Sequence, residues 1–115
     1  MPMQIVIKET GTIRKLAWTI DGVDCVQDFI GNNGGWDSFS YDDDRDVYIV
    51  SQADFNWWDK VIEDNIVLYD HLSDYRFMYG AEAVNEAINH IDCDLEDYAA
   101  SVYQALEDTF GKYDQ

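Results

Sequence analysis

Hydrophobic and polar residues alternate along the first fifty residues in a pattern that predicts β-structure. Residues 3–8 and 13–20 are rich in β-branched and apolar side chains, and Thr10-Gly11 between them favours a tight turn. A second pair of such runs, 39–41 and 47–50, flanks a cluster of aspartates. We therefore predict two β-hairpins, the second of which has an acidic tip.

The segment between the two hairpins has two interpretations. Residues 23–30 fit either a third strand or a short helix that is capped by Asp24, and we favour the helix. Residues 31–35 read Gly-Asn-Asn-Gly-Gly, which is typical of a loop between elements and too short for a domain linker.

The second half of the chain changes to the spacing of amphipathic helices. Ser51 with Asp54 three residues later resembles a capping box, and a helix is predicted over about 52–71. Its apolar positions recur every three or four residues, so one side of it is expected in the core.

Two further helices are predicted after residue 80. One covers 81–91, and the last covers 95–110 between a cap at Asp94 and a stop at Gly111. Strands thus come first and helices second, which predicts an α+β fold. We expect one domain over 1–115, with an antiparallel sheet of three or four N-terminal strands and about three C-terminal helices packed on one face.

Net charge says more about the class of this protein than any sequence motif does. The chain has 24 Asp and Glu against 7 Lys and Arg, a net charge of −17, and it is still 47% hydrophobic and 15% aromatic. A disordered acidic tail lacks that aromatic content, so a folded anionic protein is expected. Asp outnumbers Glu by 18 to 6, which favours short carboxylates held near the backbone at caps and turns.

Catalytic and metal-binding signatures are weak in this sequence. The glycines of 31–35 lack the lysine and the order of a phosphate-binding loop. His90 and Cys93 could begin a zinc site but have no second clustered pair, and Val47 stands where a calcium loop beginning at Asp42 requires glycine. We therefore expect no enzyme, no cofactor and no metal. Cys25, like Cys93, is expected to be a buried reduced thiol.

The same charge argues against several partners. Phosphate neutralisation requires Lys and Arg, so direct binding to nucleic acid is not expected. No stretch approaches the roughly 20 apolar residues of a membrane span, and the first residues do not resemble a signal peptide, so a cytoplasmic protein is expected. A basic protein is the fitting partner, because its groove for nucleic acid would accept carboxylates on a rigid surface.

In size, charge and aromatic content the chain resembles the small acidic antagonists of phages and mobile elements, which include DNA-mimicking anti-restriction proteins and anti-CRISPR proteins. The resemblance rests on composition over the whole chain and on no motif. It implies an inhibitor that binds the nucleic-acid-binding surface of a host defence complex. The carboxylates expected to contact that basic surface are Asp42, Asp43, Asp44, Asp46, Asp59, Glu63, Glu96, Asp97, Glu107 and Asp108.

Two alternatives stay open. The chain could be an acidic adaptor or immunity-type protein that binds a basic partner through a hot spot, with Trp36 or Tyr41 beside the acidic tip as its centre. It could also be a salt-adapted domain, as the Asp excess would suit. Because aromatic residues exceed what a small core needs, a homodimer is a further possibility.

Overall fold

A computed structural model of the chain describes residues 3–111, which belong to two compact units, Met1–Ile62 and Glu63–Gln115. The described strands all lie in the first unit, and the second is built from helices. The α+β class is thus confirmed. That the two units behave as one domain stays a prediction.

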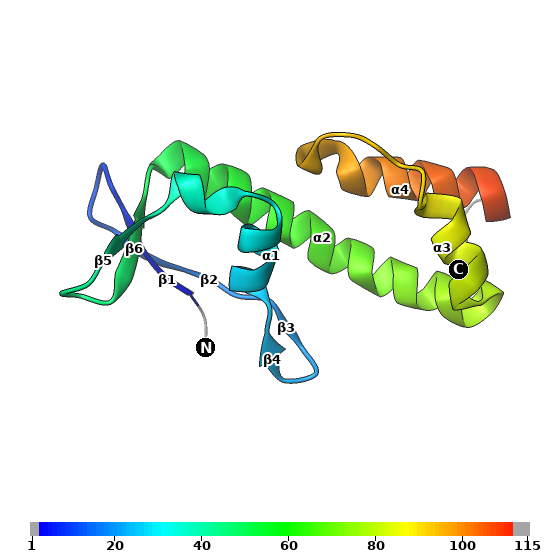
Figure 1. Cartoon of the computed structure of the whole chain (residues 1–115), viewed down its shortest axis with the longest axis horizontal. Coiled ribbons are helices and arrows are strands. Elements are labelled where there is room, and N and C mark those ends of the chain that lie inside the picture. Colours follow the sequence, from blue (N-terminus) through cyan, green and yellow to red (C-terminus); the bar gives the residue numbers. More distant parts are fainter. Residues whose placement is uncertain (1–2, 112–115) are drawn as a thin grey trace. The chain divides into compact units, whose positions relative to one another are not determined.

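A four-stranded sheet organises the first unit, in the order β2-β1-β6-β5 (Figure 1). Both predicted hairpins are confirmed, because β1 pairs antiparallel with β2, and β5 pairs antiparallel with β6. The strand predicted to reach residue 20 ends earlier, at Leu16. The strands are β1 (Met3–Ile7), β2 (Ile13–Leu16), β5 (Ser40–Asp42) and β6 (Val47–Val50).

The hairpins are joined through a parallel pair, so the prediction of a purely antiparallel sheet is wrong. Ile5 of β1 lies opposite Tyr48 of β6, and Ile7 lies opposite Val50. Ile5, Val6 and Ile7 are all buried, so β1 is covered on both faces. Such a continuous apolar run suits a central strand with a parallel neighbour better than an edge strand with one wet face.

The segment between the hairpins holds both elements that the sequence allowed. Strands β3 (Thr19–Ile20) and β4 (Val23–Asp24) form a small antiparallel sheet, and helix α1 (Val26–Asn32) follows directly. The Asp24 carboxylate accepts a hydrogen bond from the Val26 N–H at 3.0 Å, close to its predicted capping role.

The expected glycine-rich loop is mostly ordered helix. Gly31 belongs to α1, and Gly35 begins a short 3-10 helix, η1 (Gly35–Ser38). Gly34 between them has φ 68°, a conformation that glycine adopts without strain. Gly35 is buried against Trp58, which leaves no room for a side chain. Gly34 therefore allows a tight junction between α1 and η1, and Gly35 allows close packing against Trp58.

Helix α2 (Gln52–Tyr79) begins where predicted and ends eight residues later than predicted. The Asp54 N–H donates to Ser51 Oγ at 3.1 Å, as the capping box requires. At the other end, Leu72, Tyr75 and Tyr79 continue the apolar spacing beyond the predicted end. Packing along this row outweighs the poor helix propensity of Ser73 and Asp74.

Two more helices complete the second unit, so the three predicted C-terminal helices are confirmed as α2, α3 and α4. Helix α3 (Ala81–Ile88) is three residues shorter than predicted, because the chain turns at Asn89. Helix α4 (Leu95–Phe110) has the predicted bounds, with Asp94 at its N-cap and Gly111, at φ 90°, after its last residue.

The helices of the second unit share a core of their own. Rings from α2 and α4 meet in the same order along both helices: His71 contacts Tyr103, and Tyr75 contacts Phe110. The two segments therefore run parallel, with α3 in the connection between them (Figure 1). The buried residues of this core are Leu68, Leu72, Tyr75, Val84, Ala99, Val102 and Leu106.

Candidate partner-binding surface

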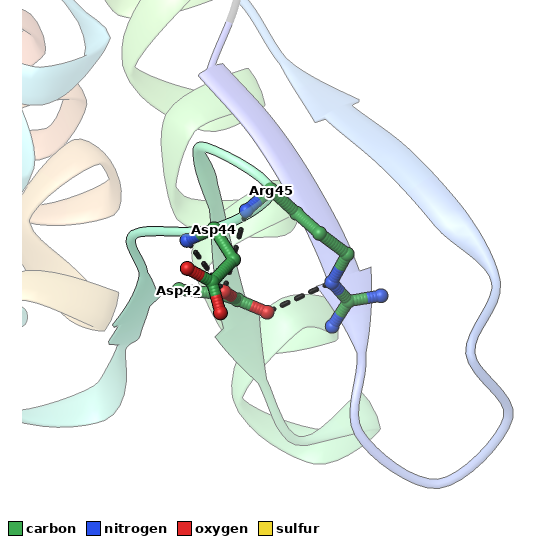
Figure 2. A network of polar contacts seen from close by, with 3 residues as sticks. All are labelled: Asp42, Asp44 and Arg45. Atoms are coloured by element: carbon green, nitrogen blue, oxygen red, sulfur yellow. Dashed lines mark hydrogen bonds and ion pairs between the residues drawn. The ribbon is translucent and has the colours of Figure 1, made fainter.

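The acidic turn between β5 and β6 is organised by one of its own carboxylates. Asp42 Oδ1 accepts hydrogen bonds from the backbone N–H groups of Asp44 and Arg45, at 3.0 and 3.3 Å. Asp42 Oδ2 forms an ion pair with Arg45 Nε at 2.8 Å (Figure 2). The Arg45 side chain and these N–H donors hold the pKa of the Asp42 carboxyl below its ordinary value. Asp42 thus fixes the turn.

A second carboxylate of the turn is also bound within the hairpin. Asp46 has φ 54°, a conformation that aspartate tolerates better than most residues, and its carboxylate accepts a hydrogen bond from the Tyr41 hydroxyl. That bond, followed by burial and the negative charge of Asp46, raises the pKa of Tyr41 to about 12. Asp46 therefore secures the far side of the turn.

Asp43 and Asp44 are left as the outward carboxylates of this turn. Both are exposed, and among the described residues neither carboxylate has a hydrogen-bond partner. The four aspartates predicted as contacts at the tip thus have two different roles in the structure. Asp42 and Asp46 hold the backbone in place, and Asp43 and Asp44 present charge on it.

The remaining predicted contacts lie on helices in both units. Asp59 on α2 is exposed and belongs to the first unit, whereas Glu63 is exposed and belongs to the second. On α4 all four predicted acids are exposed. At 100° per residue, Glu96 and Glu107 share one side of that helix, and Asp97 and Asp108 share another, about 16 Å apart along the axis in each pair. The Gln104 amide donates to Asp108 at 2.9 Å.

The second unit contains further exposed acids that the predicted set omits. Glu82 and Glu86 lie one turn apart on α3, and Asp70 lies on α2. Arg76 is the one Lys or Arg described in this unit, and its guanidinium donates to Asn85 Oδ1 at 3.2 Å. Negative charge is therefore denser here than the predicted contacts imply.

An aromatic group lies beside the acidic turn in the first unit. The rings of Trp36 and Tyr48 stack at 5.3 Å, and the ring of Tyr41 lies 5.1 Å from that of Tyr48. Trp36 and Tyr41 are exposed by 38% and 50%. These are the two aromatic residues that the sequence suggested as a hot spot, and the structure brings them together on the shared neighbour Tyr48.

Another exposed aromatic residue lies outside the predicted contacts. Phe77 on α2 is 91% exposed, and Met78 beside it is 52% exposed. Their neighbour Tyr79 is held differently, with its ring stacked on Phe110 at 4.4 Å. The helix was predicted to end near residue 71, so these residues were not expected on a helical face.

The two cysteines differ from expectation. Cys25 is half-buried, and burial, together with the charges of Asp24 and Asp28, raises the pKa of its thiol. Cys93 is exposed, so the expectation of two buried thiols is wrong for this residue.

Within residues 3–111, no three His, Cys, Asp or Glu side chains gather closely enough to hold a metal ion. Over the same residues, no helix has the length and apolarity to span a membrane.

Comparison with known proteins adds no assignment. No protein-family model matches this chain, and no curated protein or solved structure is significantly similar to it. Function is therefore argued from the charge and chemistry of the surface alone.

Proposed function

We propose that this chain is a non-enzymatic inhibitor that binds the basic nucleic-acid-binding surface of a host defence complex, of the restriction or CRISPR kind, in place of nucleic acid. The observation that carries the proposal is a set of carboxylates held on ordered elements. Nine of the ten predicted contacts are exposed, and Asp42 is half-buried. The protein acts in the cytoplasm, without turnover and without a cofactor.

Fixed charge is what such a competitor needs. A groove that binds nucleic acid presents Lys and Arg toward a regular row of phosphates. Carboxylates accept charge-assisted hydrogen bonds from the same cations. Asp43 and Asp44 stand on a turn fixed by Asp42 and Arg45, so little freedom is lost when they bind. A net charge of −17 also speeds encounter with a basic partner.

The first test is displacement by DNA. Tagged protein is immobilised, nuclease-treated bacterial lysate is passed over it at about 0.1 M salt, and a 30-base-pair duplex is added as eluent. We expect a nucleic-acid-binding complex to be captured and then released by the duplex. Failure to capture any partner would contradict the proposal.

A matched pair of variants tests the acidic turn. In one variant Asp43 and Asp44 are changed to Lys, and in the control the exposed acids Glu86 and Asp92, which are not among the predicted contacts, are changed to Lys, which alters net charge equally. We expect the first to lose most inhibition of the captured complex while the control keeps most of it, because charge reversal at a contact costs far more than charge reversal outside it. Equal losses would show that only total charge matters.

The aromatic group beside the turn favours a second candidate, an acidic adaptor with a concentrated hot spot. Trp36 and Tyr41 are exposed next to carboxylates, and aromatic residues dominate hot spots. If this function is correct, Trp36→Ala weakens binding more than the loss of Asp43 and Asp44 does, and duplex DNA fails to release the partner. The DNA step therefore separates the two candidates.

A further inference from the structure

One side of α2 in the second unit carries both acidic and apolar exposed residues. At 100° per residue these positions fall within an arc of about 100°. The arc points away from Leu68, Leu72 and Tyr75, which lie in the core. We call this surface the outer α2 face, and it consists of Glu63, Val67, Asp70, Asp74, Phe77 and Met78.

The apolar members of the outer α2 face are unusually exposed. Phe77 is 91% exposed, Met78 52% and Val67 48%. Single exposed hydrophobic residues are ordinary, but these three share one arc and lie on both sides of Asp70 and Asp74. Val67 and Phe77 are about 15 Å apart along the helix, the span of almost three turns. This arrangement fits an elongated partner with apolar residues at matching intervals.

Charge decides which partner fits this face. The second unit has 13 Asp and Glu against two Lys and Arg, so a second copy of the chain docked here would bring like charges together. A basic helix avoids that repulsion, because its Lys and Arg would meet Glu63, Asp70 and Asp74 while its apolar side covers Phe77.

We propose that the outer α2 face docks onto a basic amphipathic helix of the partner protein, with Phe77 as the anchor. This inference rests on the proposed function, because it names the protein element that the inhibitor contacts outside the nucleic-acid groove. A phenylalanine ring desolvated at the centre of a contact contributes affinity that salt does not screen. Acidic residues around it set orientation and exclude neutral partners.

The test uses two labelled synthetic helical peptides of 18 residues with equal numbers of lysine. One carries leucine along a single face, and the other has glutamine at those positions. Binding is followed by fluorescence anisotropy at about 0.15 M salt and repeated at about 0.5 M. We expect the leucine peptide to bind about tenfold more tightly at 0.15 M and to keep more of its affinity at 0.5 M.

Variants assign that difference to the outer α2 face. Phe77→Ala should weaken the leucine peptide about tenfold and leave the glutamine peptide unchanged. Tyr69→Ala is the matched control, because Tyr69 is an exposed aromatic residue of α2 outside the arc. Circular dichroism checks that both variants keep their helix content.

Three results would overturn the inference: equal binding of both peptides, no effect of Phe77→Ala, or an equal effect of Tyr69→Ala. Self-association through Phe77 in sedimentation would also overturn it, in favour of a second copy. Failure of the proposed function would appear in a different experiment, the displacement of the partner by duplex DNA. If no partner is released by duplex DNA but the leucine peptide still depends on Phe77, the docking face stands and the decoy role falls.

Discussion

The two units of this protein use carboxylates differently. In the first unit, 11 acids accompany five Lys and Arg, and several acids accept hydrogen bonds from backbone N–H groups. Glu9 accepts from the Gln52 N–H at 2.9 Å, Asp24 accepts from Val26, and Asp42 accepts from its own turn. In the second unit, 13 acids accompany only two basic residues, and most lie on exposed helix faces.

This difference separates carboxylates that accept hydrogen bonds from the backbone from carboxylates that lie mostly on exposed helix faces. A carboxylate that satisfies backbone N–H groups stabilises local structure and is partly neutralised there. Exposed acids on helices repel one another and lower stability. The surplus in the second unit therefore calls for a role outside folding, which the proposed binding to a basic partner would supply.

The largest expected effect concerns the core of the second unit. Leu106 is fully buried there, and Leu106→Ala should lower the free energy of unfolding by about 3 kcal/mol through lost burial and the cavity left behind. Urea unfolding followed by circular dichroism at 222 nm measures this loss.

The same variant tests whether the chain is one domain. All four tryptophans lie in the first unit, so their emission reports on that unit alone. If the two units unfold together, Leu106→Ala shifts the tryptophan transition as much as the ellipticity transition. A tryptophan midpoint equal to that of the unsubstituted protein would show two independently folding units.

A smaller effect is expected when a methyl group is added at Gly35 in the first unit. This methyl group would meet Ile30 Cγ2 at 2.6 Å and the Trp58 ring even more closely. Gly35→Ala should therefore destabilise the first unit by about 2 kcal/mol, measured by tryptophan emission in urea. If the Trp58 ring is the cause, the same change should cost less in a Trp58→Phe background. An unchanged midpoint for Gly35→Ala would contradict this packing.

The smallest effect distinguishes two causes of a raised tyrosine pKa. The bond to Asp46 raises the pKa of Tyr41 to about 12, whereas burial is the main cause of the raised pKa of Tyr75. Since the folded pKa exceeds the unfolded value of about 10, the Tyr41 contribution to stability is complete below pH 10 and lost as the pH rises through about 12.

Absorbance at 295 nm follows these ionisations directly. Asp46→Asn should lower the pKa of Tyr41, which a difference titration against Tyr41→Phe isolates. Glu107→Gln should change the pKa of Tyr75 little, because the charge of Glu107 contributes less than burial does. If Asp46→Asn and Glu107→Gln changed the pKa of Tyr41 and of Tyr75 by the same amount, the carboxylates of the two units would not differ in this respect.

Local signals in the sequence predicted most elements and missed how they assemble. The bounds of α4 follow from Asp94 and Gly111, and the hairpins follow from turn residues beside β-branched runs. Parallel pairing of β1 with β6 depends on residues some forty positions apart, which no local pattern specifies. The continuous apolar run Ile5-Val6-Ile7 was the available sequence signal of a central strand.

The candidate surface was predictable in composition but not in detail. Aspartates were expected at the hairpin tip, yet the division between Asp42 and its outward neighbours depends on backbone conformation. Aspartate is favoured at the first position of such turns, so Asp42 could have been recognised as a turn residue. Phe77 was not placed on a helix because the helix was predicted to end near residue 71, six positions before it.

The parallel pair at the centre of the sheet also determines when β1 can complete its pairing during translation. Strand β1 can pair with β2 as soon as residue 16 has left the ribosome, but its other edge has no partner until the end of β6 follows, about 34 residues later. At typical translation rates that interval lasts about 2 to 7 s. During that time an apolar strand exposes an open edge, which is a template for aggregation. The yield of protein from cells should therefore depend on how quickly residues 17–50 are made.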